Sequence, residues 1–323
     1  AEVTGNAILG MTSAASSLAN AGSIAFRGQG DLVATKGIDS PAIVLQSIAG
    51  GGGWLGNIGG NAELGASHIG QANAGDIKAT INFDSIQTAG ENSTGLLVQS
   101  IGGGGGFVGS TSGSSLTLGS TLTTGSSSNT GEIDLQNRAD ITTFGINSAA
   151  LIAQAIGGGG GAAATNDGDT IRMGSSSTAV DGETFPLINT GNVSVNNTAN
   201  LRTNAIGSAV LLAQSIAGGG GYISETNGSD EYTITFGANG NLNANASDVT
   251  VNNSGESLSS VGNYSPALVA QSIGGGGGFA LISAKSGGST RIGAINNNLG
   301  RANSGNVSVT NNALLYTQGN FST

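Results

Sequence analysis

The sequence predicts an all-β fold, a parallel β-helix or β-solenoid that includes ordered oligoglycine segments. Three observations predict it. A repeat of about 56 residues runs through the chain, short segments alternate apolar and polar residues with period two, and no stretch of ten residues has a helical period. Glycine supplies 59 of 323 residues, far above its usual share of about 7 %, and charged residues make up only 9 %.

The repeat is defined by a motif of the type TGLLVQSIGGGGGF. Five copies lie at residues 41–54, 94–107, 149–162, 209–222 and 266–279. Their glutamines are 53, 55, 60 and 57 residues apart, and a serine precedes each glutamine by six residues. A fixed period of this length is typical of architectures in which each unit packs on its neighbours.

Short strands and turns account for the sequence between the motifs. Segments such as 131–145 and 191–205 alternate apolar with polar residues and are interrupted by Asn and Gly, which tolerate left-handed backbone angles. The six residues before a glycine run, such as 268–273, are apolar on both faces apart from Gln and Ser. We therefore expect a strand that is buried on both faces. The variable segment 175–187 is expected to be an external loop.

The repeat length also predicts a shape. A coil of about 18–20 residues, built from three short strands and three corners, gives about three coils per repeat, about 17 coils in all and a rod roughly 80 Å long. Residues 191–208 align without gaps with residues 305–322, which precede the place of a sixth motif. The sequence is therefore interpreted as a single repeat array, residues 1–323, cut from a longer chain or filament.

The glycine runs are predicted to be ordered rather than flexible linkers. Each run has four or five glycines, begins three or four residues after the glutamine and ends directly before a fixed position. Ordering glycine costs about 0.5–1 kcal/mol more per residue than ordering alanine, so each run costs about 2.5–5 kcal/mol. Close approach of another backbone, which a Cβ atom would block, is the expected compensation.

We expect the glutamine side chains and the glycine runs to form a structural seam, within one chain or between chains. A buried amide without partners would cost about 1–3 kcal/mol, and the bare backbone of a glycine run is the natural partner. The candidate seam residues are Gln46, Gln99, Gln154, Gln214, Gln271, Gly51, Gly104, Gly159, Gly219 and Gly276.

An aromatic residue follows the glycine run in four of the five motifs. These residues are Trp54, Phe107, Tyr222 and Phe279, and Ala162 takes the place in the third copy. The constant phase predicts one aromatic stripe. Core filling, or a cap over the glycine run, is favoured over an exposed stripe that would promote lateral association.

Composition excludes several classes of partner and chemistry. A net charge of −10 opposes binding to nucleic acid and to anionic lipid, and no apolar run approaches the length of a membrane span, so we expect no membrane insertion of this segment. The absence of cysteine excludes disulfides, thiolate metal sites and a cysteine nucleophile.

Catalytic and metal-binding residues are sparse. The one histidine, His68, lies in a variable segment and is interpreted as a solvated loop residue rather than part of a Ser-His-Asp site. The acidic pairs Asp167/Asp169 and Asp230/Glu231 offer calcium ligands, but each occurs once and neither belongs to a calcium-roll pattern. We expect no enzyme activity, no cofactor and no metal site.

The repeated string AQSIGGGGG resembles the glycine-rich repeats of large autotransporters, the type V secreted passenger proteins of Gram-negative bacteria. The resemblance extends over all five motif copies. It implies a β-helical passenger that crosses the outer membrane unfolded and is displayed on the cell surface or shed from it. The lack of cysteine fits this route, because disulfides formed in the periplasm would hinder threading.

These expectations favour a non-catalytic, extracellular structural rod that mediates adhesion or biofilm-type contacts. The expected partners are adjoining repeats or other copies of the chain, joined laterally or end to end, and surface glycans or proteins of host or bacterial cells. Two alternatives remain open. The chain forms a filament through its glycine-rich seams, or, less favoured, it is a β-helical enzyme that acts on polysaccharides.

Overall fold

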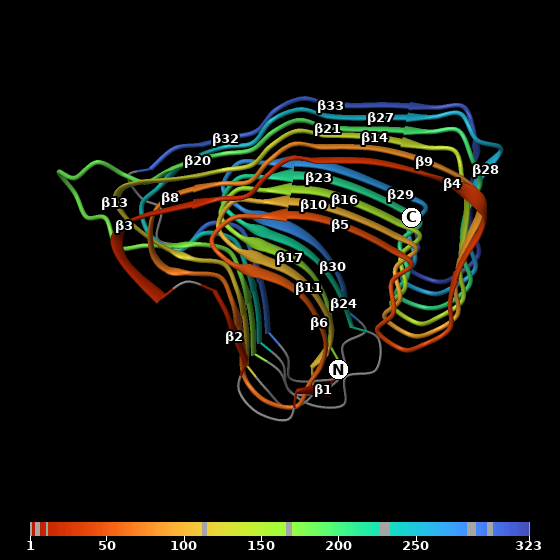
Figure 1. The fold of residues 1–323 in the computed structure, drawn as a ribbon, viewed down its shortest axis with the longest axis horizontal. Helices are drawn as coiled ribbons and strands as arrows, with labels where there is room; N and C mark the ends of the chain where they lie inside the picture. Colours follow the sequence, from red (N-terminus) through yellow and green to blue (C-terminus); the bar gives the residue numbers. More distant parts are fainter. Residues whose placement is uncertain are drawn as a thin grey trace.

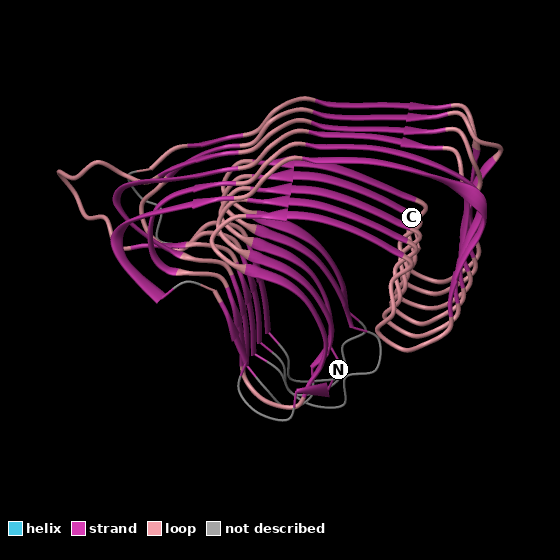
Figure 2. Cartoon of the chain, viewed as in Figure 1, coloured by secondary structure: helices cyan, strands magenta, loops and turns pink. Residues whose placement is uncertain are grey.

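The computed structural model describes residues 2–3, 7–10, 12–111, 115–165, 170–225, 233–282, 289–295 and 300–322. Within these residues the protein is all-β, without a helix, and every strand pairing is parallel. The prediction of an all-β protein with parallel sheets is confirmed. Figure 1 shows the sheets around a curled, incompletely closed cross-section, and Figure 2 shows that strands and loops alternate along it.

Five parallel sheets make up the fold, and each is built from equivalent strands of successive repeats. The glutamine sheet contains β5 (Ile43–Ile48), β10 (Leu96–Ile101), β16 (Leu151–Ile156), β23 (Leu211–Ile216) and β29 (Leu268–Ile273). The glycine sheet contains β1 (Glu2–Val3), β6 (Gly52–Ile58), β11 (Gly105–Thr111), β17 (Gly160–Thr165), β24 (Gly220–Glu225) and β30 (Gly277–Ile282).

Two further sheets follow the glycine sheet along the chain. The short-strand sheet contains β2 (Ala7–Leu9), β7 (Ala62–Leu64), β12 (Ser115–Leu118), β18 (Thr170–Met173), β25 (Thr233–Phe236) and β31 (Ser289–Ile292). The asparagine sheet contains β3 (Thr12–Asn20), β8 (Ser67–Asn73), β13 (Thr121–Asn129), β20 (Leu187–Asn189), β26 (Asn243–Asn245) and β32 (Ala302–Asn303), and β19 (Ser176–Ser177) pairs with β13.

The long sheet completes each repeat before the chain returns to the glutamine sheet. In its first two repeats a single long strand, β4 (Ile24–Thr35) and then β9 (Ile77–Thr88), crosses the sheet, and in later repeats two shorter strands replace it. These are β14 (Ile133–Asn137), β15 (Asp140–Thr143), β21 (Val193–Asn197), β22 (Leu201–Thr203), β27 (Val249–Asn253), β28 (Ser257–Ser260), β33 (Val307–Asn311) and β34 (Leu314–Thr317).

The prediction of about three coils per repeat is wrong. Equivalent strands pair one whole repeat apart, so that Gln99 lies beside Gln46 on one side and Gln154 on the other. The estimate assumed three short strands in a coil, whereas each repeat places strands of up to 12 residues in five sheets. The glycine sheet, with six strands about 4.8 Å apart, therefore extends roughly 30 Å, not 80 Å.

The strands of one repeat form one layer, and layers stack in register. The first layer is β1–β4, and each of the next five begins with a strand of the glutamine sheet, ending with β29–β34. The glutamine sheet lies between the long sheet and the glycine sheet (Figure 1), and apolar side chains fill both spaces. Strands β10, β16 and β23 are accordingly buried on both faces.

Candidate functional site: the glutamine–glycine seam

The glycine runs form the corner between the glutamine sheet and the glycine sheet. The seam glycines adopt left-handed backbone angles, with φ of 98° at Gly51, 85° at Gly104 and 90° at Gly159, and of 92° at both Gly219 and Gly276. Only glycine adopts this conformation without strain. The sequence therefore places glycine where the chain must turn sharply into the next sheet.

Neighbouring glycine runs hydrogen-bond to one another along the stack. The Gly105 N–H donates to the Gly51 carbonyl at 3.1 Å, and the Gly160 N–H donates to the Gly104 carbonyl at 3.1 Å. A Cβ atom on Gly160 would lie 2.0 Å from the Gly220 oxygen. The runs are thus ordered backbone in contact with backbone, inside a single chain.

A second column of glycines, which we did not predict, packs against the runs. These residues end the strands of the short-strand sheet, and they are Gly10, Gly65, Gly119, Gly174, Gly237 and Gly293. A Cβ atom on Gly159 would lie 2.5 Å from the Gly119 Cα, and one on Gly219 would lie 2.5 Å from the Gly174 Cα. The recurring pattern of an alternating apolar run that ends in glycine, as in LTLG and ITFG, is the feature that could have revealed this column.

The five glutamine side chains form a continuous amide ladder. The Nε2 of each of the first four donates to the Oε1 of the glutamine in the next layer, as Gln99 does to Gln154 at 2.8 Å and Gln154 does to Gln214 at 2.8 Å. The ladder begins at Gln46, whose Nε2 donates to Gln99 at 2.7 Å, and ends at Gln271, whose Oε1 accepts from Gln214 at 2.7 Å. The pattern fixes the register of five layers.

The same amides hold the glycine runs in place. The Gln154 Nε2 donates to the carbonyl of Gly161 at 3.2 Å, and the Gln214 Nε2 donates to that of Gly221 at 3.3 Å. Gln154 and Gln214 are fully buried, so both hydrogens of each amide are used away from water. Since an unpaired buried polar group costs about 1–3 kcal/mol, the ladder and the glycine runs depend on each other.

The aromatic residues occupy one column of the glycine sheet, next to the seam. Phe107 pairs in register with Trp54 and with Ala162, and Tyr222 pairs with Ala162 and with Phe279. Phe107 is 4 % exposed, whereas Trp54, in the second layer, is 41 % exposed. The rings of Tyr222 and Phe279 are stacked, with centroids 6.4 Å apart. The column therefore fills space between the glutamine and glycine sheets.

Two titratable side chains are buried close to this column. The Tyr222 hydroxyl donates to the Gly207 carbonyl at 2.8 Å, and burial raises the pKa of Tyr222 to about 12. Burial also raises the pKa of the Asp39 carboxyl above its ordinary value, against the opposing effect of hydrogen bonds from Asn92 and Ser110. Both side chains take part in packing between layers.

Serine side chains form a further ladder at a corner of the fold. The backbone N–H of Ser93 donates to the Ser148 Oγ at 2.9 Å, and Ser208 donates likewise to Ser265 at 3.0 Å. These serines are the ones that precede each glutamine by six residues.

Two asparagine ladders, which the sequence analysis missed, run through the asparagine and long sheets. The members of the first are Asn20, Asn73, Asn129, Asn189, Asn245 and Asn303, and those of the second are Asn137, Asn197, Asn253 and Asn311. An asparagine at a constant position of each repeat is the feature that could have revealed them.

The residues considered for catalysis or metal binding are not brought together. His68 is exposed, and it lies in strand β8 at an irregularity in the register rather than in the expected loop. The pairs Asp167/Asp169 and Asp230/Glu231 lie outside the described residues. Within the part of the chain that the structure describes, no three His, Asp or Glu side chains are grouped so as to hold a metal ion, and no helix could cross a membrane.

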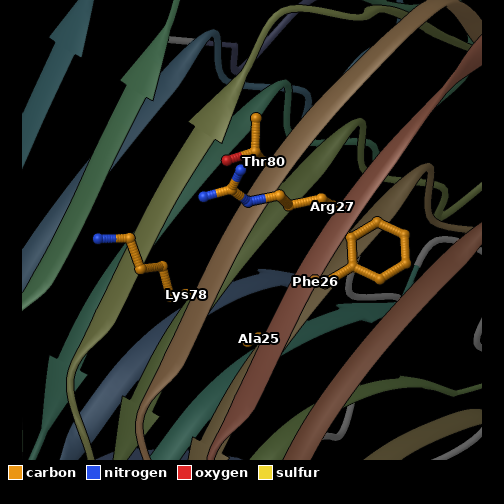
Figure 3. Close-up of a pocket in the computed structure, with 5 residues that line it drawn as sticks. All are labelled: Ala25, Phe26, Arg27, Lys78 and Thr80. Carbon is orange, nitrogen blue, oxygen red and sulfur yellow. The ribbon is translucent and has the colours of Figure 1, made fainter.

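The surface has several depressions, and two of them contain the basic side chains Arg27, Lys78 and Arg172. The larger, of 320 Å³, is lined by Ala25, Phe26, Arg27, Lys78 and Thr80 on strands β4 and β9 (Figure 3). Lys78 forms an exposed ion pair with Asp134 at 3.3 Å. The smaller, of 120 Å³, is lined by Glu63, Thr117, Gly119, Ser120, Thr121, Arg172, Gly174 and Ser176.

No family model, curated protein or solved structure matches the chain. The repeat and the contacts described above are therefore the basis for a function.

Proposed function

We propose that the protein is a non-catalytic structural scaffold, a parallel β-solenoid with one turn per repeat that acts as an adhesive segment on a bacterial cell surface. One observation carries this proposal. The residues that recur in every repeat, the glutamines, glycines and serines, form hydrogen bonds with their equivalents in the neighbouring layers. Repeats joined in this way lengthen the stack of layers and make it rigid.

The order of the strands supports a solenoid. In every repeat the chain passes through the glutamine, glycine, short-strand, asparagine and long sheets in the same sequence. Each strand then pairs in parallel with its equivalent one repeat later, as β16 does with β23. This is the behaviour of a chain that winds once per repeat.

The motif supports an extracellular location. The AQSIGGGGG string resembles that of autotransporter passengers, and a cysteine-free chain of stacked repeats suits a protein that crosses a membrane unfolded and folds outside. Sequential addition of layers would allow folding to advance along the chain, because each layer finds its partners on the one before it.

The outer faces of the sheets offer surface for adhesion. The groove with Arg27 and Lys78 and the depression with Arg172 present hydrogen-bond donors among hydroxyl side chains, a chemistry suited to glycan hydroxyls and carboxylates. The depression with Arg27 and Lys78 contains none of the seam residues, whereas the depression with Arg172 is lined by Gly119 and Gly174, which pack against the glycine runs.

Adhesion can be tested with beads that carry the folded chain. We expect the beads to adhere to bacterial or animal cells under flow, and beads carrying the Gly159→Ala variant, which is expected not to stack correctly, to detach. If both kinds of bead adhere equally well, adhesion depends on the amino-acid composition of the chain and not on its folded stack of layers. Polysaccharide cleavage that is lost on replacing one carboxylate would replace the proposal by the enzyme alternative.

A self-assembling filament is a second candidate, favoured by the apolar residues exposed on the outermost layers. Val307, Leu315 and Phe321 are exposed in the last layer, and Leu32 and Ile38 are exposed in or near the first. Light scattering distinguishes the two candidates. A monomer at micromolar concentration supports a single scaffold, and growth into long fibres supports a filament.

A further inference from the structure

The outer face of the short-strand sheet carries polar side chains in one straight column. In β7, β12 and β18 buried residues alternate with exposed or half-buried ones, so Glu63, Thr117 and Arg172 all point away from the core. Thr117 pairs in register with Glu63 in the second layer and with Arg172 in the fourth. Glu63 and Arg172 are therefore two strands apart, which separates their backbones by about 9.6 Å.

This column lines the depression of 120 Å³. Gly119 and Gly174, which also line it, place no side chain beside Arg172. The hydroxyl groups of Thr121 and Ser176, 3.1 Å apart, form another part of the wall. Pockets for drug-sized ligands are larger, about 300–1000 Å³, so this depression accommodates one small group of a larger molecule.

Arg172 lacks an acceptor within the described part of the chain. Its Nη2 atom is buried and forms no hydrogen bond there. Glu63 lines the same depression, but the only ion pair among the described residues joins Lys78 to Asp134. Since a buried donor without a partner is costly, and since a guanidinium matches a carboxylate with two parallel hydrogen bonds, Arg172 favours a ligand carboxylate.

Glu63 imposes the opposite requirement, two strands away. Its side chain is exposed, and an ionised carboxylate only accepts hydrogen bonds. A charge repels another only weakly across about 10 Å of water, whereas a hydrogen bond from a ligand hydroxyl to Glu63 is charge-assisted. A ligand that suits the whole depression therefore carries an anionic acceptor at one end and hydroxyl donors at the other.

A sugar acid meets both requirements. A hexuronic acid has one carboxylate and several hydroxyl groups on a single ring, and such a ring with a hydrogen bond at each end spans about the distance between Glu63 and Arg172. A carboxylate without hydroxyl groups gives Glu63 no donor. A neutral sugar gives Arg172 no charged acceptor.

We propose that this depression binds a uronic acid unit of an acidic polysaccharide. The Arg172 guanidinium donates to the carboxylate of the sugar, Glu63 accepts from its ring hydroxyls, and the Thr117 hydroxyl lies between these two contacts. The proposal rests on the adhesive function proposed above, and it names the class of glycan that one site on the surface takes.

Binding can be measured by ligand-observed NMR on the whole chain titrated with methyl β-glucuronoside. Methyl β-glucoside is the matched control, because its ring has the same hydroxyl arrangement but no carboxylate. Acetate supplies the carboxylate without the ring. We expect the glucuronoside to bind at least tenfold more tightly than either control, because only it forms hydrogen bonds with both Arg172 and Glu63.

Variants separate the two contacts. Arg172→Gln is expected to weaken glucuronoside binding at least tenfold, whereas Arg202→Gln, an equal change of charge at an exposed position of the long sheet, leaves binding unchanged. Glu63→Gln is expected to weaken binding about threefold, because the acceptor loses its charge. The urea midpoint of Arg172→Gln should equal that of the unaltered chain, so that a loss of binding reports on the site.

Several outcomes would overturn the proposal. Binding of acetate or of the glucoside as tight as that of the glucuronoside would exclude a uronic acid site, and tighter binding by Glu63→Gln would indicate a plain anion site. Equal losses in Arg172→Gln and Arg202→Gln would assign binding to net charge.

The site and the adhesive function can fail separately. If the glucuronoside does not bind but beads carrying the chain still adhere to cells, the site is excluded and the adhesive scaffold stands. If the glucuronoside binds as expected but the beads do not adhere, the site stands and adhesion is excluded.

Discussion

Strands β23 and β29 have nearly the same sequence, LLAQSI and LVAQSI, and very different surroundings. Every residue of β23 is buried between β16 and β29, whereas every residue of β29 is half-buried, with β23 as its one partner among the described strands. A single repeat therefore does not bury its own apolar residues. Burial and hydrogen bonding come from the layer above and the layer below, so inner and outer copies of one motif should differ in energetic weight.

The largest difference is expected at the glycine runs. Gly159→Ala places a Cβ atom 2.5 Å from the Gly119 Cα at a φ of 90°, and we expect it to lower the free energy of unfolding by about 4 kcal/mol. Gly53, in the second layer, has a φ of 140°, and a Cβ added there by Gly53→Ala has no atom within 4 Å. We expect this substitution to lower the free energy of unfolding by only about 1–2 kcal/mol, the cost of the strained backbone angle. Urea unfolding of both variants measures the difference, and equal losses would show that backbone angle alone matters.

The glutamine ladder should show the next largest difference. Gln154→Leu leaves the Gln214 Oε1 without a donor and the Gly161 carbonyl without its side-chain partner, in a fully buried place. We expect a loss of about 2–3 kcal/mol. Gln271→Leu removes one acceptor in the half-buried last layer, and we expect a loss below about 1 kcal/mol. Equal melting temperatures for Gln154→Leu and the unaltered chain would remove the ladder as a stabilising element.

A smaller effect is expected inside the aromatic column. Tyr222→Phe gives the inner layer the residue that Phe279 supplies in the last layer, and it removes the hydroxyl that donates to the Gly207 carbonyl. Since the Ser224 Oγ also donates to that carbonyl, at 2.7 Å, the loss should be about 1 kcal/mol. Thermal unfolding followed by circular dichroism measures it. A loss above that of Gln154→Leu would mean that Tyr222 contributes more than this hydrogen bond.

The smallest effect concerns pH. The pKa of Asp39 is raised in the folded protein, so the folded state binds more protons than the unfolded state, and stability should fall as pH rises from about the ordinary value of 3.8 through the raised pKa. Asn92 and Asn147 occupy the same place in the next layers. Asp39→Asn should therefore abolish this dependence and increase stability at neutral pH by less than about 1 kcal/mol. An unchanged slope of unfolding free energy against pH would assign the dependence to another group.

Much of the stacking could be anticipated because repetition shows which positions are equivalent. The burial of β16 on both faces follows from its apolar sequence, and equal phase marks Gln99 and Gln154 as equivalent. Their direct pairing was not predicted, because three coils per repeat would have placed them three coils apart. The position of a residue within the repeat does not show how the chain runs between two equivalent positions. The prediction of three coils failed because a repeat of this length is also compatible with one wide circuit through five sheets.

The seam was anticipated only on one side. The runs that contain Gly104 and Gly159 are conspicuous as sequence, but the single glycines that they contact, Gly65 and Gly119, are ordinary in composition. Their contacts with the glycine runs exist only in the folded chain, so the sequence alone does not reveal them. The ladder of Asn137 and Asn197 was missed for a related reason, since the asparagines also suit turns.

The spacing of 60 residues between Gln154 and Gln214 is the longest in the array, yet both side chains remain in the ladder. Residues 178–186, between β19 and β20, connect strands of the asparagine sheet and form the green protrusion at the left of Figure 1. A solvent-facing insertion is therefore absorbed without loss of alignment elsewhere. This corner is a natural place to graft a foreign epitope or an enzyme, which the array would hold at a fixed height.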